Sequence, residues 1–166
     1  NSSLFLHLRL QIMSTIIITG ATGGLGLSVT QRLLQDGHRV LATLGRSGAE
    51  ELLQNPMLEA TSLDLQDDRA TAEFVRSALT RHGDVGAAVL LVGGFAMGKL
   101  AETTDEMLDK MIRLNFHTAF HVVRHLLPHF LARPEGGQFI LAGSRPGLEA
   151  AAGKDFFAYS LSKSMI

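Results

Sequence analysis

The chain contains no cysteine and no tryptophan, and it has a single tyrosine. Without cysteine it has no disulfides, no thiolate nucleophile and no zinc site with cysteine ligands, which agrees with a reducing compartment. An excess of basic residues is also missing, because 15 lysines and arginines stand against 16 aspartates and glutamates. The charge therefore points to neither nucleic acid nor membrane as a partner, and we expect a cytoplasmic protein that holds its ligands by local geometry.

Long hydrophobic runs are missing as well. The first twelve residues include an apolar stretch, but His7 and Arg9 interrupt it, and it is too short to span a bilayer. No basic segment precedes it and no small-residue cleavage site follows it, as a secretory signal would require. We therefore expect residues 1–12 to be an extension without function ahead of a natural start at Met13, rather than a targeting segment.

From Thr15 onward, short β-branched runs alternate with amphipathic stretches, which is the pattern of βαβ units that build a parallel sheet. Strands are predicted over residues 15–19, 39–44, 58–63, 87–92 and 138–142. Helices are predicted over 25–35, 67–81, 104–111 and 113–132, and from 156 or 157 to 166. The expected fold class is α/β: a Rossmann-like, doubly wound parallel sheet of about five strands with flanking helices, in one domain over residues 13–166.

The last predicted helix ends in SLSKSMI, without a C-cap glycine, a polar tail or a following strand. The fifth strand would then be an exposed apolar edge, a feature that favours association with another chain. We expect these residues to be the N-terminal part of a longer protein whose last strands are missing here, and we expect a homo-oligomer.

A glycine-rich segment, TGATGGLG at residues 19–26, directly follows the first predicted strand. Between a strand and a helix, glycines permit a tight turn, close approach of a pyrophosphate to the backbone, and close packing of the helix on the strand. Gly20, Gly24 and Gly26 stand where these three requirements fall. A turn without a ligand is the alternative, but the buried-type strand before it and the helical apolar spacing after it favour dinucleotide binding.

Residues after the next strands bear on the choice of cofactor. LATLGRSG has no acidic residue for a ribose 2′-hydroxyl, but its Arg46 suits a 2′-phosphate, which favours NADP over NAD; a solvated surface arginine is the alternative. Asp64 in SLDLQDD is placed for the adenine pocket, for capping the helix expected near Asp67, or for both. Gly93 and Gly94 end the fourth strand with small residues that let a ring approach.

The predicted cofactor-binding residues are Gly20, Thr22, Gly24, Leu25, Gly26, Arg46, Asp64, Leu65, Gly93, Gly94, Tyr159 and Lys163. Tyr159 and Lys163, in YSLSK, lie four residues apart and so share one face of the last predicted helix. A phenol with a pKa of about 10 is a poor acid–base catalyst at neutral pH, but a neighbouring ammonium favours the phenolate. A surface pair without function is the alternative, and the glycine-rich segment favours the catalytic interpretation.

In this order along the chain, the segments resemble the short-chain dehydrogenases/reductases. TGATGGLG is similar to the family's TGxxxGxG cofactor loop, and Asp64 to its adenine-side acid. Asn115 in MIRLNFHTAF resembles its structural and catalytic asparagine, Ser144 in ILAGSRPG its catalytic serine, and Tyr159 with Lys163 its YxxxK pair. The resemblance spans Met13 to the C-terminus and favours the common single-domain branch, although TGATGGLG also satisfies the TGxxGxxG pattern of the extended branch.

The resemblance implies an NADP(H)-dependent oxidoreductase that interconverts a carbonyl and an alcohol on a small molecule by hydride transfer. Tyr159 would exchange the proton with the substrate oxygen, Ser144 would polarise that oxygen, and Lys163 would bind the nicotinamide ribose and lower the pKa of Tyr159. Asn115 would support a water relay to Lys163. An NAD(P)-binding module that senses or scaffolds without turnover, or an inactive fragment of the enzyme, is the alternative.

Three features depart from the family pattern. LVGG at residues 91–94 replaces the usual NNAG and loses both asparagines. Ser144 precedes Tyr159 by fifteen residues, more than is usual, so that AAAGKDFF is expected to form a longer loop. The strands and the substrate-covering loop that follow the YxxxK helix in the family are not in this sequence.

Four histidines, His117, His121, His125 and His129, recur at every fourth residue. Histidines at this spacing can share a metal ion, but each step of four drifts by about 40° around a helix, and no carboxylate is near in the sequence. Ala119, Val123, Leu126, Leu127 and Phe130 are expected on the opposite side, facing the sheet or another subunit. We predict no metal site, and interpret the histidines as a partly exposed helix face or as a subunit contact with pH-dependent assembly.

Overall fold

The computed structural model describes residues 13–44 and 54–166, and its centre is a five-stranded parallel sheet with the strand order β3-β2-β1-β4-β5. The strands are β1 (Thr15–Thr19), β2 (Arg39–Leu44), β3 (Leu58–Ser62), β4 (Val85–Leu90) and β5 (Gln138–Leu141). The predicted fold class and all five predicted strands are confirmed.

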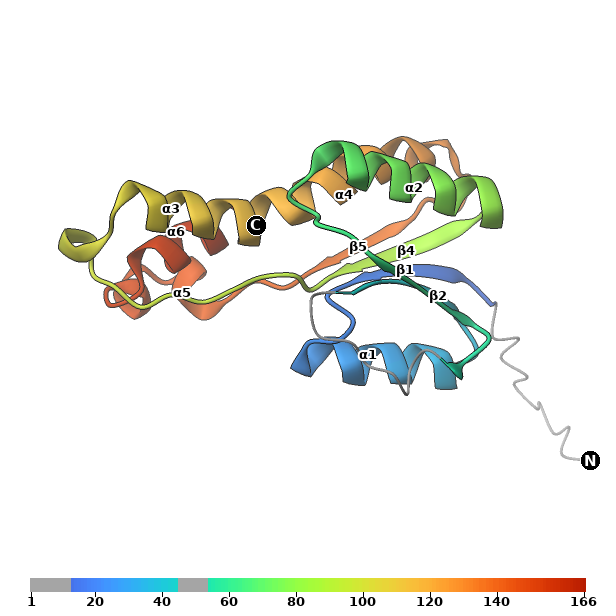
Figure 1. Ribbon diagram of the computed structural model, residues 1–166, viewed down its shortest axis with the longest axis horizontal. Helices are drawn as coiled ribbons and strands as arrows, with labels where there is room; N and C mark the ends of the chain where they lie inside the picture. Colours follow the sequence, from blue (N-terminus) through green and yellow to red (C-terminus); the bar gives the residue numbers. More distant parts are fainter. Residues whose placement is uncertain (1–12, 45–53) are drawn as a thin grey trace, which may run out of the picture.

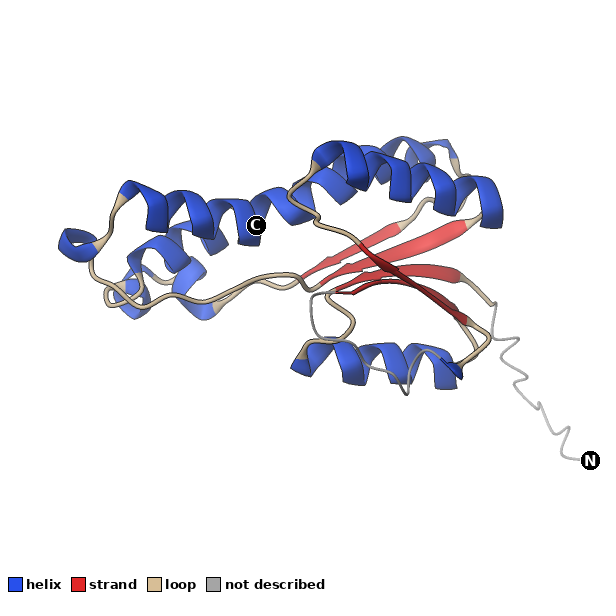
Figure 2. Ribbon diagram, viewed as in Figure 1, coloured by secondary structure: helices blue, strands red, loops and turns tan. Residues whose placement is uncertain are grey.

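Helices cover both faces of this sheet. α1 (Gly24–Gln35) lies on one face, and α2 (Asp68–His82) and α4 (Thr118–Ala132) lie on the other (Figure 1). α3 (Asp105–Ile112), α5 (Arg145–Leu148) and α6 (Phe157–Ser164) form a group beyond the carboxyl ends of the strands (Figure 2). Among the helices of the described residues, none is both long enough and apolar enough to cross a membrane.

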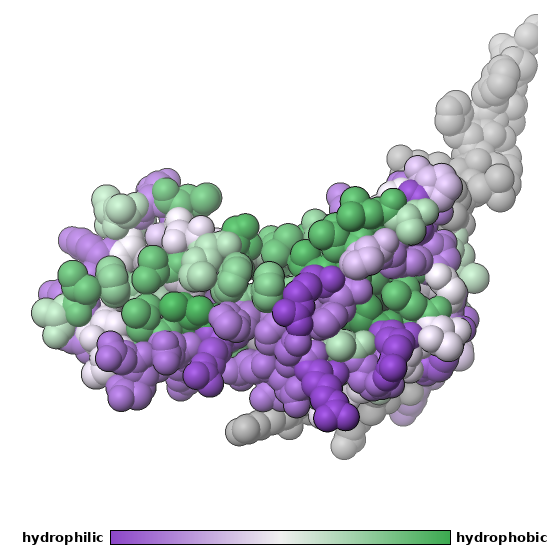
Figure 3. All heavy atoms as spheres, turned by 90° about the horizontal axis from the view of Figure 1, so that it is seen from above, coloured by the Kyte–Doolittle hydropathy of each residue, from purple (hydrophilic) through white to green (hydrophobic). Residues whose placement is uncertain are grey.

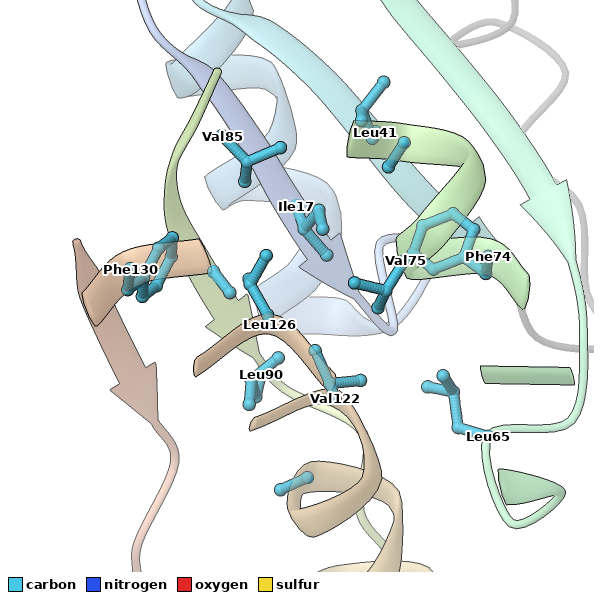
Figure 4. Packing of buried hydrophobic residues seen from close by; sticks show 13 residues of the cluster. Ile17, Leu41, Leu65, Phe74, Val75, Val85, Leu90, Val122, Leu126 and Phe130 are labelled. Carbon is cyan, nitrogen blue, oxygen red and sulfur yellow. The ribbon is translucent and has the colours of Figure 1, made fainter. Parts of the chain in front are cut away.

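Buried side chains explain why the strands are nearly continuous apolar runs. Successive residues of a strand point to opposite faces of a sheet. Ile17 packs with residues of α2 and α4, among them Val75 and Leu126 (Figure 4), whereas its neighbours Ile16 and Ile18 pack on the α1 side. Because both faces are covered, the central strands need an apolar residue at every position.

Most element boundaries differ slightly from the prediction, and the largest differences are at β4 and after Ser144. β4 begins two residues earlier than expected, because Val85 is fully buried and pairs with Thr15 of β1. The segment AAAGKDFF, predicted as a longer loop, begins with a 3-10 helix, η4 (Ala150–Gly153), and α5 lies between Ser144 and this segment. A serine N-cap and a proline in the first turn are both helix-starting signals, which explains α5.

β5 is the least covered strand of the sheet. Ile140 and Leu141 are 44% and 38% exposed, although both are large hydrophobic residues. The expectation of an exposed apolar edge at the fifth strand is confirmed for this chain.

Between β1 and β4 the chain changes its direction of winding, from strands added on one side of β1 to strands added on the other. Ligands of open α/β sheets bind at such a switch point, outside the carboxyl ends of the strands.

Candidate active site

A cleft of about 770 Å³ opens at the carboxyl ends of the strands, around the switch point between β1 and β4. Its walls come from the turns after β1, β3 and β4, from the end of β2, and from the α3–α4 region. Five of the predicted cofactor-binding residues line it: Gly20, Thr22, Asp64, Leu65 and Gly93.

The glycine-rich segment forms the turn from β1 into α1. Gly20 has a φ of +71°, in the left-handed region that favours glycine. Gly26 is buried at the start of α1, and a Cβ at this position would clash with the carbonyl oxygen of Gly20. α1 can therefore pack this closely on the turn only because residue 26 has no side chain.

The first turn of α1 is suited to an anion. Its N-cap is Gly23, so no side chain caps the N–H groups of the first turn. A Cβ at Gly24 would meet nothing within 4 Å, whereas Leu25 points its side chain toward solvent and is 62% exposed. Uncapped N–H groups at the positive end of a helix, next to open space, fit a pyrophosphate. The residues around this turn therefore fit the pyrophosphate of a dinucleotide.

The segment after β3 forms one wall of the cleft, at the β3 edge of the sheet. The Asp64 carboxylate accepts a hydrogen bond from the N–H of Gln66 at 2.9 Å and remains beside the cleft. The prediction that Asp64 caps the next helix is wrong. Asp67 caps it, because this carboxylate lies directly before α2 and accepts from the N–H groups of Arg69 and Ala70. Asp64 is thereby left for the cleft alone.

Asn115 is fully buried in a π-helical segment, η3 (Arg113–His117), between α3 and α4. Its Oδ1 accepts from the N–H of Gly94 at 2.7 Å, and its Nδ2 donates to the carbonyl of Gly94 at 3.1 Å. Nδ2 also donates to Oγ of Ser162 on α6 at 2.9 Å. π-Helical turns are rare and frequently occur at functional sites. Here one side chain joins the segment after β4 to the helix that carries Tyr159.

Ser162 is a residue of this site that the sequence analysis missed. Its side chain is fully buried, accepts from Asn115, and donates to the carbonyl of Tyr159 at 2.7 Å. The available signal was a serine directly before Lys163, on the side of an amphipathic helix that faces inward. No catalytic motif marks that position, because its role is to receive Asn115.

The LVGG segment keeps its two glycines for steric reasons. A Cβ at Gly93 would lie 2.7 Å from Oδ1 of Asn115 and 3.4 Å from Nζ of Lys163. A Cβ at Gly94 would clash with the side chain of Leu114. The glycines therefore leave room for the buried asparagine and for the lysine, while the two asparagines of the family pattern are replaced by Leu91 and Val92.

α6 carries Tyr159 and Lys163, so the prediction that both lie on one helix is confirmed. The Tyr159 ring meets the ring of Phe95 edge-on, with 5.0 Å between the centroids. Lys163 Nζ donates to the carbonyl of Ala142, just after β5, at 2.6 Å. Burial lowers the pKa of the Lys163 ammonium, because removal from water disfavours the charged form. Lys163 approaches the cleft through Gly93, at the end opposite to Asp64.

Ser144 begins α5, and its Oγ accepts from the N–H of Gly147 at 3.3 Å. α5 packs tightly on α6, since a Cβ at Gly147 would lie 2.8 Å from the backbone carbonyl carbon of Lys163. Ser144 follows Ala142, whose carbonyl accepts from Lys163, by two residues. The packing of α5 on α6 therefore brings Ser144 to the helix that carries Tyr159, in spite of their long separation in sequence. Arg46 lies outside the described residues, and its contact with a 2′-phosphate stays a prediction.

Three of the four histidines, His117, His125 and His129, are half-buried, as expected for a partly exposed helix face. His121 is buried, with Nδ1 2.9 Å from the carbonyl oxygen of Leu65. His125 lies 2.8 Å from the Asp68 carboxylate, which is distant in sequence, and His129 lies 3.2 Å from the first carbonyl of β4. α4 packs beside α2 as well as on the sheet, which explains why His121 and His125 have partners within the protein. In residues 13–44 and 54–166, no group of three histidine, cysteine or acidic side chains is arranged to hold a metal ion.

The outward side of α4 is apolar instead. Phe120, Leu127 and Leu131 are 42%, 40% and 77% exposed. Leu127 was expected to face the sheet or another subunit; it does not face the sheet, and its contact with another subunit stays a prediction. Seen from the side of α2 and α4, hydrophobic residues form a band across the molecule next to a hydrophilic region (Figure 3). A subunit contact lined by the histidines stays a prediction.

The sequence profile of short chain dehydrogenases matches residues 14–166, which is nearly the whole chain. The chain belongs to the short chain dehydrogenase family. This short chain dehydrogenase is 32% identical over 104 residues to the 3-oxoacyl-(acyl-carrier-protein) reductase MabA of Mycobacterium tuberculosis, over 63% of this chain and 40% of MabA. It is 28% identical over 142 residues to the (S)-acetoin-forming diacetyl reductase of Staphylococcus epidermidis, over 82% of this chain and 55% of that protein.

Solved structures share the fold of this short chain dehydrogenase. The structure of ElxO with NADP bound superposes with a TM-score of 0.83 at 22% identity, covering 93% of this chain and 64% of ElxO. The chain spans about half the length of the curated relatives that it matches.

Proposed function

We propose that residues 13–166 form an NADP(H)-binding domain and that this short chain dehydrogenase interconverts a carbonyl and an alcohol on a small molecule. The proposal rests on one observation. The uncapped first turn of α1 opens into the middle of a cleft, between Asp64 after β3 and Gly93 after β4, where Lys163 approaches. A dinucleotide is an extended molecule with a pyrophosphate at its centre, so its centre fits this turn and its two halves fit the two ends of the cleft.

Each candidate residue has a task in this proposal. The N–H groups of α1 hold the pyrophosphate, and Asp64 accepts from the adenosine half. Lys163 gives one of its three N–H donors to Ala142, and the others serve the hydroxyls of the nicotinamide ribose. NADPH, when bound, supplies a hydride to the carbonyl carbon.

Tyr159 completes the reaction at the oxygen. In reduction its hydroxyl gives a proton to the carbonyl oxygen while the carbon takes the hydride, and in oxidation both return. Ser144, the N-cap of α5, polarises that oxygen. Tyr159 and Lys163 lie on α6, and Ser144 lies at the start of α5. The close contact between these two helices supports the proposal. The proposal retains a cytoplasmic homo-oligomer, for which the apolar outward side of α4 offers a contact surface.

Binding and turnover of the unmodified chain test this proposal. NADPH binding is measured by fluorescence titration, and NADPH consumption is followed with small carbonyl compounds that include diacetyl and a 3-oxoacyl thioester, the substrates named for its relatives. We expect saturable binding and consumption of NADPH with at least one of them. Binding without any turnover would favour a sensing or scaffolding module, which the loss of both asparagines in LVGG makes a real alternative. No binding would contradict the proposal.

Replacing Arg46 by alanine tests the choice between NADP and NAD. A guanidinium that pairs with the 2′-phosphate contributes a charge-assisted bond that NADH cannot use, so the Kd for NADPH should rise about tenfold or more while the Kd for NADH stays nearly the same. Arg69→Ala is the matched control, because its N–H serves the Asp67 cap through the backbone alone. Equal losses for both cofactors in Arg46→Ala would contradict the phosphate role.

A further inference from the structure

The wall of the cleft after β3 is held from α4, a helix more than fifty residues away in sequence. Leu65 is buried in that wall, between Asp64 and Gln66, and its carbonyl oxygen lies 2.9 Å from Nδ1 of His121. A carbonyl oxygen only accepts, so this imidazole carries its proton on Nδ1. The hydroxyl of Thr71 lies 3.4 Å from the same oxygen, but its single proton is donated to the carbonyl of Asp67 at the shorter 2.9 Å.

A second contact, between α2 and α4, lies next to the first. Asp68 is the first residue of α2, directly after the wall segment, and its carboxylate contacts both Arg124 and His125 of α4. These contacts and the neighbouring charges lower the pKa of Asp68, with the hydrogen bond from His125 as the largest cause. α4 therefore fixes the wall segment itself through His121, and the helix that follows it through Asp68.

We propose that His121 is a positioning residue for the adenosine half of the cofactor. The inference rests on the proposed function. Backbone at Leu65 fixes where the neighbouring residues Asp64 and Gln66 stand, and both line the cleft. β3 is at one edge of the sheet and β5 at the other, so this wall lies at the end of the cleft far from Lys163. His121 acts through the Leu65 carbonyl and does not touch the reacting atoms.

His129 supplies a matched control on the same helix. Its Nε2 lies 3.2 Å from the carbonyl oxygen and 3.4 Å from the amide nitrogen of Val85, so this imidazole also bonds to the backbone of a distant segment. Val85 begins β4, however, so this bond lies at the amino edge of the sheet, whereas the cleft lies at the carboxyl edge. Loss of either bond should affect stability, but only the loss at His121 should affect the cofactor.

The test compares His121→Leu, His129→Leu and His121→Asn by titration with NADPH, with 2′,5′-ADP and with nicotinamide mononucleotide. His121→Leu removes the donor, and we expect the Kd for NADPH and for 2′,5′-ADP to rise about tenfold, the usual effect of one unsatisfied buried acceptor. The Kd for nicotinamide mononucleotide should stay within about twofold of that of the unmodified protein, because that ligand occupies the other end of the cleft. Urea denaturation of each variant separates loss of stability from loss of affinity.

His121→Asn places an amide N–H close to the position of Nδ1, and we expect it to recover most of the affinity for 2′,5′-ADP. If His121→Leu does not fold, His121→Gln replaces it, since its longer side chain moves the donor away from the Leu65 carbonyl. An unchanged Kd for 2′,5′-ADP in His121→Leu, or in the His121→Gln variant that replaces it, overturns the role of His121. An equal rise of this Kd in His129→Leu also overturns it. Absence of NADPH and 2′,5′-ADP binding in the unmodified chain would instead overturn the proposed function.

Discussion

Replacing Tyr159 by phenylalanine is expected to lower the rate of NADPH-dependent carbonyl reduction about a hundredfold or more. The substitution removes only the hydroxyl that exchanges the proton with the substrate oxygen. The ring remains edge-on against Phe95, 5.0 Å between centroids, so α6 should keep its place. The Kd for NADPH should therefore change by less than about threefold, which separates a lost chemical step from lost binding.

Ser160→Ala is the matched control for this experiment. It removes a hydroxyl from the next residue of α6, one that donates to the carbonyl of Gly153 at 3.3 Å. A peripheral bond of this length contributes little, so the rate should stay within about threefold of that of the unmodified protein. Reduction at an undiminished rate by Tyr159→Phe would show that another group supplies the proton.

Replacing Gly26 by valine is expected to lower the free energy of unfolding by about 3 kcal/mol or more. A side chain at this position meets the backbone carbonyl of Gly20, and backbone cannot move aside as the end of a flexible side chain can. α1 would have to separate from the turn, which also uncovers Ile16 and Ile18 on the α1 side of the sheet. Urea denaturation, followed by circular dichroism, measures the loss.

Gly24→Ala, two residues earlier, is the control that distinguishes packing from ligand contact. Its Cβ would meet nothing within 4 Å, and the residue lies in helical backbone, so stability should stay within about 0.5 kcal/mol of that of the unmodified protein. The same methyl group projects into the space proposed for the pyrophosphate, so NADPH binding should weaken. Equal stability of the Gly26→Val and unmodified proteins would contradict the packing argument.

The strands were predictable because burial on both faces leaves a direct trace in the sequence. TIIIT is buried throughout and apolar at its three central positions, and the order of short apolar runs and amphipathic stretches is enough to indicate a parallel sheet. The glycine positions were predictable for a related reason. At Gly20 the backbone conformation, and at Gly26 the space, exclude a side chain.

The contacts between elements were not predictable in this way. The spacing of His121, His125 and His129 describes one helix, but their surroundings depend on α2, whose position the helix itself does not encode. Asp64 was considered as a cap because the helix was predicted to begin at Asp67, whereas Asp67 is itself the N-cap. Ser162 matches no motif, because it owes its role to Asn115, 47 positions earlier in the chain.

The two hydrogen bonds of Asn115 to Gly94, with its third bond to Ser162, have a consequence for the thermodynamics of ligand binding. Freezing a segment of backbone costs about 1–2 kcal/mol per residue, wherever in the cycle the freezing occurs. Because these bonds form when the chain folds, α6 loses its conformational freedom then, and a ligand that arrives later finds the helix already ordered. Ligand binding to such a protein costs less conformational entropy, because the protein is ordered before the ligand arrives. The enthalpy of each contact with the ligand then contributes more fully to the affinity.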